Sequence, residues 1–228
     1  MIRELREWKY LALLAGLLIA GVIEPLAADW SDRTQILASF VVVGINLGVF
    51  LVIFEQRWER GLAFFLVALA LASAIVRETL SGWAPVAAIA YHCFALLFLG
   101  LAVAVILRRI FHQETIRTDT VVGALCGYLL AAAAWANAYA LIYLLRPGSF
   151  RAADAIAGRL GDWHFQRFLF SYFSVTTLTS LGYGDITPIG PLALSLSWLE
   201  VVFGQFYIAV VVAQLVGLRL AQSIKPGN

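Results

Sequence analysis

The sequence is poor in charged residues and in the residues that build metal or disulfide sites. Only 13% of its 228 residues are Asp, Glu, Lys or Arg, where a soluble domain has about 25%. The net charge of +2 is too small to indicate a nucleic-acid partner. Its three histidines and two cysteines show no metal-ligand spacing. No acid–base pair or nucleophile constellation predicts an enzyme or an organic cofactor.

The two cysteines, Cys93 and Cys126, both lie inside apolar runs. Disulfides of exported proteins usually join loops, so we expect neither an internal disulfide nor a disulfide-linked partner. Both thiols are expected to pack as small apolar side chains.

Apolar residues are what the chain has in excess, at 62% of the total. So much apolar surface cannot be buried in one core, and lipid must be the solvent for part of it. The first apolar run lacks a convincing small-residue cleavage site, which predicts a retained span rather than a signal peptide.

Six apolar runs are candidates for membrane spans, because about 20 apolar residues cross the hydrocarbon core. The first is expected to end near Glu24 and Pro25. The first and third are slightly short, although Arg60 and Arg77 can extend from the ends of the third to the interface. The runs cover residues 8–23, 34–54, 61–76, 84–107, 120–145 and 192–218.

The distribution of Lys and Arg predicts the orientation. These residues gather in the connections on one side of the membrane, whereas the two short loops on the other side hold Arg33 and Arg77. Positive residues favour the cytoplasmic side, so both termini are expected to be cytoplasmic. The compact sequence indicates a plasma membrane, and we expect a bacterial inner membrane.

The segment between the fifth and sixth runs carries the functional signal. Its first part, from residue 146, is polar, and residues 167–179 (RFLFSYFSVTTLT) are apolar and aromatic. This second part is long enough for a helix of three or four turns, which is too short to cross. The glycine-bearing stretch SLGYGDITP follows. Irregular backbone at membrane depth must be buried in protein or line a water-filled cavity, which favours a pore.

Residues 177–185 (TLTSLGYGD) resemble the potassium-channel signature, in which loops of TVGYG replace the water around the ion with carbonyl oxygens. Residues 198–218 (WLEVVFGQFYIAVVVAQLVGL) are similar to the inner helix of bacterial two-span pore modules. The resemblance implies K+ sites at Ser180, Leu181, Gly182 and Tyr183. The implied ion-binding filter consists of Thr179, Ser180, Leu181, Gly182, Tyr183 and Gly184.

Elementary chemistry agrees with this resemblance. Gly182 and Gly184 can reach the positive φ angles that turn consecutive carbonyls the same way. Tyr183 can direct its ring outward and brace the filter. The preceding helix is expected to end near Leu178, with its partial negative charge toward the cavity. One loop cannot encircle an ion, so a rotationally symmetric oligomer is required, and the resemblance implies a homotetramer.

The sequence departs from the usual signature at two positions. Ser180 stands where Thr is usual, and Leu181 stands where Val is common. The serine keeps the hydroxyl, expected to supply the innermost oxygen, but lacks the stiffening methyl. We therefore expect a looser innermost site, and a weakly selective cation channel is the first alternative.

Two carboxyl groups are candidates for supporting the filter. By the resemblance, Asp185 accepts a hydrogen bond from the hydroxyl of Tyr172, the alternative being a solvated carboxylate at the outer mouth. Glu200 is the only carboxylate inside a predicted span, where charge is costly. We expect it to face one of three hydroxyl residues behind the filter. It acts there either as a strut, in charged or protonated form, or as a pH-sensitive gate. Those residues are Ser174, Thr176 and Thr177.

Other residues inside the spans have two readings each. Gly204 is the gating hinge by resemblance, or a site of close helix packing. His92 is a hydrogen-bonded packing residue or a proton sensor. Glycine pairs spaced by four residues indicate tight helix contacts: Gly44 with Gly48, and Gly123 with Gly127.

The leading spans lack the features of known gating modules. Residues 84–107 hold no Arg or Lys, so steep voltage sensing is not expected. The ten residues after 218 are too few for a ligand-binding module. We expect residues 1–118 to form a four-helix transmembrane bundle with a linker, and residues 119–228 to form the pore domain.

The sequence thus predicts an all-α membrane protein with six transmembrane helices. A re-entrant pore helix and a selectivity filter lie between the fifth and sixth. The expected function is passive K+ conduction in a lipid membrane without steep voltage gating. A less favoured alternative is an ion-translocating transporter subunit similar to Trk-type proteins, which carry four pore loops in one chain where this chain has one.

Overall fold

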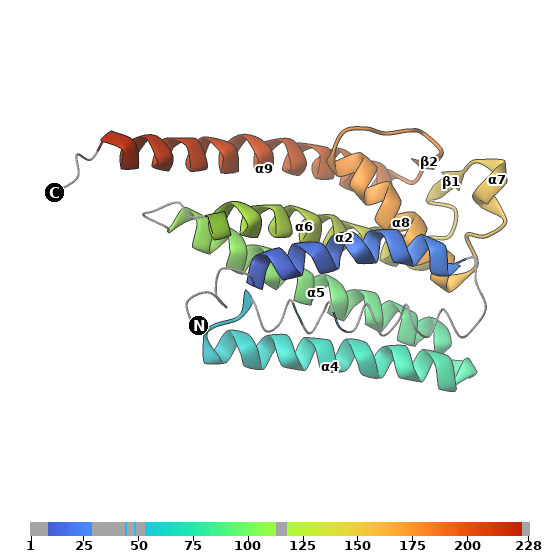
Figure 1. The fold of residues 1–228 in the computed structure, drawn as a ribbon. Coiled ribbons are helices and arrows are strands. Elements are labelled where there is room, and N and C mark those ends of the chain that lie inside the picture. The colour runs from blue at the N-terminus through green and yellow to red at the C-terminus, as the bar shows by residue number, and fades with distance from the viewer. Residues whose placement is uncertain (1–8, 29–43, 45–47, 49–52, 113–117, 225–228) are drawn as a thin grey trace.

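The computed structural model of the chain describes residues 9–28, 44, 48, 53–112 and 118–224 (Figure 1). Helices dominate these residues. In chain order the elements are α2 (Lys9–Ala28), α4 (Arg57–Thr79), η1 (Ser81–Trp83), α5 (Ala84–Phe111), α6 (Thr118–Leu145), β1 (Phe150–Ala152), α7 (Asp154–Ala157), α8 (Trp163–Leu178), β2 (Ile186–Pro188) and α9 (Pro191–Ile224).

Among the described residues, four helices are long and apolar enough to cross a membrane: α4, α5, α6 and α9. They contain the predicted third, fourth, fifth and sixth runs, which places the chain in a membrane. The first run lies in α2, whose shorter apolar part is Tyr10–Ile23. This apolar part ends before Glu24 and Pro25, as expected for the run, although the helix itself continues to Ala28. Most of the second run lies outside the described residues.

Local signals explain where several helices begin. The Asp162 carboxylate accepts hydrogen bonds from the backbone amides of His164 (3.0 Å) and Phe165 (3.4 Å), which satisfies free donors at the start of α8. Pro191 begins α9, and a proline lies in the first turn of α5. Proline is tolerated there because its missing N–H has no partner within the helix.

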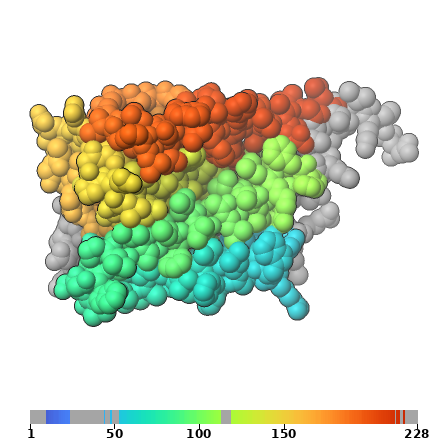
Figure 2. All heavy atoms as spheres, turned by 180° about the vertical axis from the view of Figure 1, so that it is seen from behind, coloured from blue at the N-terminus to red at the C-terminus, as the bar shows by residue number. Residues whose placement is uncertain are grey.

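The long helices lie side by side in the order α9, α6, α5, α4, and α2 packs against α6 (Figure 1). Figure 2 shows α9 and α4 on opposite edges of the molecule. The shorter α8 packs obliquely against α6 and α9 at one end. One apolar core lies mainly between α2, α4, α5 and α6, and a second lies between α6, α8 and the two strands. The segment with the glycine signature connects two elements of this second core, α8 and β2.

Two short strands interrupt the predicted all-α architecture. β1 and β2 pair antiparallel, with Phe150 opposite Pro188 and Ala152 opposite Ile186. Phe150, Ala152 and Ile186 are buried, whereas Arg151 is exposed, which is the alternation of a half-buried strand. Gly148 at φ 84° lies in the turn between α6 and β1. β1 precedes α8 in the chain, and β2 follows residues 179–184. Their pairing therefore holds together the two ends of the segment that contains α8 and this stretch.

Candidate functional site

The backbone at residues 180–184 alternates in handedness. Ser180, Gly182 and Gly184 have positive φ values of 60°, 51° and 80°, whereas Leu181 and Tyr183 do not. An alternation of right- and left-handed residues turns successive N–H groups toward one side of the chain. Glycine adopts the left-handed conformation at little cost, while Ser180 adopts it at some steric cost.

The amide groups of this stretch face the end of α8. The amide of Ser180 donates to the Thr177 carbonyl at 2.9 Å, and the amides of Leu181 and Gly182 donate to the Thr176 carbonyl at 2.8 and 3.2 Å. In a trans peptide the N–H and the preceding C=O point in opposite directions. The carbonyls of Thr179, Ser180 and Leu181 therefore point away from α8. Residues 179–184 are all exposed in the single chain, which leaves these oxygens available.

The end of α8 lies where the sequence predicts it, at Leu178. The Leu178 carbonyl accepts a hydrogen bond from the Tyr128 hydroxyl on α6 at 3.0 Å. A Cβ atom on Gly204 of α9 would overlap the same carbonyl oxygen. Gly204 is thus a close-packing position, and α9 is helical through it. Its role as a hinge stays a prediction.

The C-terminal end of the stretch is fixed by Asp185. The Tyr172 hydroxyl donates to Oδ2 of Asp185 at 2.7 Å, the hydrogen bond that the sequence predicts. The Ile186 amide donates to Oδ1 at 3.1 Å, and the Ala153 amide donates to the Asp185 carbonyl at 2.8 Å. The Tyr183 ring lies parallel to that of Tyr172, with centroids 6.3 Å apart and an interplanar angle of 1°. Asp185 thereby links the stretch to α8 and to the chain beside β1.

Glu200 connects three helices. Its side chain is fully buried (0% exposed). Oε2 accepts from the Tyr139 hydroxyl of α6 at 2.5 Å, and Oε1 lies 2.5 Å from the Ser174 hydroxyl of α8. Ser174 is one of the three expected partners, whereas the Thr176 hydroxyl donates to the Phe173 carbonyl instead. Tyr139 was missed, because a tyrosine in an apolar run gives no sign of its partner.

The hydrogen-bond geometry around Ser174 favours a neutral Glu200. The Ser174 oxygen also lies 2.8 Å from the Ala132 carbonyl. A carbonyl only accepts, and serine has one hydroxyl hydrogen, so this hydrogen cannot serve both contacts. A protonated Glu200 that donates from Oε1 to Ser174 satisfies both contacts and still accepts from Tyr139. A neutral carboxyl also avoids the cost of an unpaired charge within the membrane.

The N-terminal end of the stretch contacts α9. The Gln205 side-chain amide donates to the Ser180 hydroxyl oxygen at 2.9 Å. Sequence reasoning did not assign Gln205, although an amide side chain within an apolar span was a usable signal. Ser180 therefore has a side-chain partner on the final helix.

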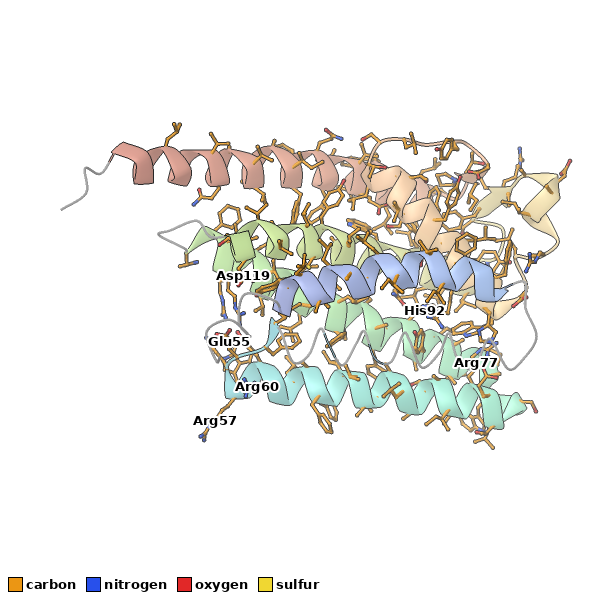
Figure 3. The ribbon with its side chains drawn as sticks, viewed as in Figure 1. Glu55, Arg57, Arg60, Arg77, His92 and Asp119 are labelled. Atoms are coloured by element: carbon orange, nitrogen blue, oxygen red, sulfur yellow. The ribbon has the colours of Figure 1, made fainter. Side chains whose placement is uncertain are left out.

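His92 lies in a packed polar and aromatic cluster away from this stretch. Nδ1 of His92 is 2.8 Å from Oδ1 of Asn137, and its ring centroid is 5.0 Å from that of Trp163, the first residue of α8. The guanidinium of Arg77 lies 4.2 Å over the Trp163 ring. Figure 3 shows His92 and Arg77 toward the same end of the bundle. These contacts fit a packing role for His92, and no finding tests the alternative of a proton sensor.

The opposite end of the bundle carries several arginines. Figure 3 shows Arg57 and Arg60 there, far from Arg77. Arg108 pairs with the fully buried Glu59, and Arg109 lies 3.4 Å from Glu55. These basic residues thus lie at the end of α4 and α5 remote from α8. The predicted orientation depends on this gathering of basic residues at one end of the bundle, away from Arg77.

Of the predicted glycine pair at residues 123 and 127, Gly127 lies at a tight helix contact and Gly123 at an ordinary van der Waals contact. A Cβ on Gly127 would approach the Tyr207 hydroxyl and would lie 3.0 Å from Cγ2 of Ile106, and one on Gly123 would lie 3.5 Å from the Tyr10 ring. At the other pair, Gly44 and Gly48, no atom of the described residues lies within 4 Å of either Cβ position, so the expected tight contact is not found there.

Comparison with known proteins defines the class. Residues 138–218, from the second half of α6 into the final turns of α9, match a family model described as an ion channel. The glycine signature, α8, Glu200 and Gln205 all fall within this match. This part of the chain is thus similar to ion-channel domains, which supports an ion channel. No curated protein and no solved structure gave a match.

Proposed function

We propose that the chain is one subunit of a potassium-selective channel. In this proposal four copies surround an axis, and the carbonyl oxygens of residues 179–184 line it. The observation that carries the proposal is the direction of the backbone: three consecutive amides face α8, so the preceding carbonyls face away from protein. Such oxygens can replace the hydration shell of K+. The bond from Tyr172 to Asp185 and the Glu200 contacts would hold the filter in this shape.

Conduction in this proposal is passive and not steeply voltage-dependent. Each charge moved through the membrane field yields about 2.3 kcal/mol per 100 mV. Helix α5 has basic residues only in its last turn, at Arg108 and Arg109, so it offers no mid-membrane charge to move. The leading helices would form a peripheral bundle on the pore. The arginine-bearing end would be cytoplasmic and the filter would face outward, in a bacterial inner membrane.

The test is K+ flux into liposomes that contain the purified protein. Wild type should pass K+, and Gly182→Asp should abolish the flux, because a side chain at φ 51° distorts the carbonyl ring. Gly158→Asp is the matched control, since Gly158 has φ −65° and no atom lies within 4 Å of its Cβ position. Equal fluxes from wild type and Gly182→Asp would contradict the proposal.

The second candidate is a weakly selective cation channel. It is favoured by Ser180, whose side chain has no methyl branch and whose φ of 60° is itself strained. Reversal potentials in mixed K+ and Na+ separate the two candidates. A potential that follows the K+ gradient supports selectivity, and a potential near zero in opposed gradients of the two ions supports the second candidate.

A further inference from the structure

Gln205 is a polar side chain in an otherwise apolar part of α9. An unsatisfied amide within a membrane costs several kcal/mol, so its partner matters. That partner is the hydroxyl of Ser180, 2.9 Å from Nε2. This bond joins the final helix directly to the stretch with alternating backbone handedness.

The Gln205 side chain is exposed in the single chain, but residues beside it in α9 are closely packed and set the position of its backbone. The neighbouring Gly204 lies against the Leu178 carbonyl so tightly that no Cβ fits. Two residues after Gln205, the Tyr207 hydroxyl donates to the Ala124 carbonyl of α6 at 2.7 Å. Helix α9 is thus anchored to α8 and α6 at this level, and the Gln205 amide is held at the inner end of residues 180–184.

The bond determines where the Ser180 oxygen lies. A serine hydroxyl has two lone pairs and rotates freely when it has no partner. The Gln205 amide occupies one lone pair and fixes the rotamer, which leaves the second lone pair for a cation. Threonine would be stiffened by its own methyl, but a β-branched residue is strongly disfavoured at the φ of 60° found here.

We propose that Gln205 is the positioning residue for the innermost cation site. It holds the Ser180 hydroxyl in the geometry that binds the ion, in place of the branch that serine lacks. Because Gln205 belongs to α9, a displacement of this helix breaks the bond and weakens the site. Occupancy of the filter is thereby linked to the position of the final helix. The inference rests on the proposed function.

The test is Ba2+ block of K+ current in planar bilayers, with Ba2+ added to either side in turn. Ba2+ is close to K+ in size and doubly charged, so it reports the innermost oxygen ring. Gln205→Leu should weaken block at least about fivefold, the effect of one neutral hydrogen bond. In the Ser180→Gly background, which removes the hydroxyl at a φ that glycine accepts, Gln205→Leu should have no further effect.

A matched control lies on the same helix. Gln214→Leu makes the same chemical change about two and a half turns away and should leave block unchanged. If Gln205→Leu does not assemble, Gln205→Asn, one methylene shorter, should show the same loss of block. Additive effects of Gln205→Leu and Ser180→Gly, or an equal effect of Gln214→Leu, would overturn the inference while K+ conduction stood. A wild type that passes no K+ would overturn the proposed function and this inference with it.

Discussion

Replacing Glu200 by Gln and by Leu separates a neutral from a charged carboxyl at this buried position. If Glu200 is protonated, glutamine reproduces both contacts. Its Nε2 donates to the Ser174 hydroxyl and its Oε1 accepts from Tyr139, which are the two contacts seen at 2.5 Å. If Glu200 is charged, both hydroxyls must donate to it, and the glutamine amide then meets a donor.

The expected magnitudes differ enough to measure. For a neutral carboxyl, Glu200→Gln should change the free energy of unfolding by less than about 1 kcal/mol per subunit, since two neutral hydrogen bonds are exchanged for two others. Glu200→Leu should cost about 1–3 kcal/mol, because it removes the carboxyl group that accepts from the Tyr139 hydroxyl, itself 0% exposed, and that contacts Ser174. Tyr139→Phe in the Leu background should recover part of this loss.

The assay is thermal unfolding of the purified protein in detergent, followed by tryptophan fluorescence. An infrared difference spectrum between wild type and Glu200→Gln supplies a direct check, because a protonated carboxyl has a C=O stretch that the amide lacks. If Glu200→Gln is as unstable as Glu200→Leu and no carboxylic acid band appears, the protonated assignment is wrong.

Two further substitutions test the contacts around residues 179–184. Under the proposed function, Tyr172→Phe, which removes the 2.7 Å bond to Asp185, should speed inactivation or lower the K+/Na+ permeability ratio, with Tyr143→Phe, next to Phe170, as a control. Unchanged currents would show that this bond does not support the stretch. Gly204→Ala should destabilise the protein by about 1–3 kcal/mol, since the Cβ overlaps the Leu178 carbonyl. Gly217→Ala is the control, because its Cβ position is open, and it should not destabilise the protein in the same melting assay. If Gly204→Ala and Gly217→Ala are equally stable, close packing is not the role of Gly204 and the hinge is favoured.

Several features were predictable because their causes are local in the sequence. The runs that became α4, α5, α6 and α9 were recognised by length and hydropathy, which depend on composition alone. The end of α8 at Leu178 was also predicted, because glycines follow within a few residues and cannot favour a continued helix. The Tyr172–Asp185 bond was predicted through the family resemblance, as its residues lie 13 positions apart.

Other features depend on how distant segments meet. The pairing of β1 with β2 was missed, since three-residue strands have no periodic signal. The sequence indicated that Glu200 needs a partner but not that Tyr139, 61 positions away, supplies one. Likewise, Gly204 was left between hinge and packing until the Leu178 carbonyl was located.

Membrane-crossing helices and a stretch able to turn its carbonyls one way can both be read from the sequence, because apolar length and glycine placement act through the local backbone. The side chains that hold this stretch become known only from the folded chain. Gln205 meets Ser180 across 25 positions, and Glu200 meets α6 and α8 together. Side-chain hydrogen bonds reach only about 3 Å, so their partners are set by the packing of helices and not by the order of residues.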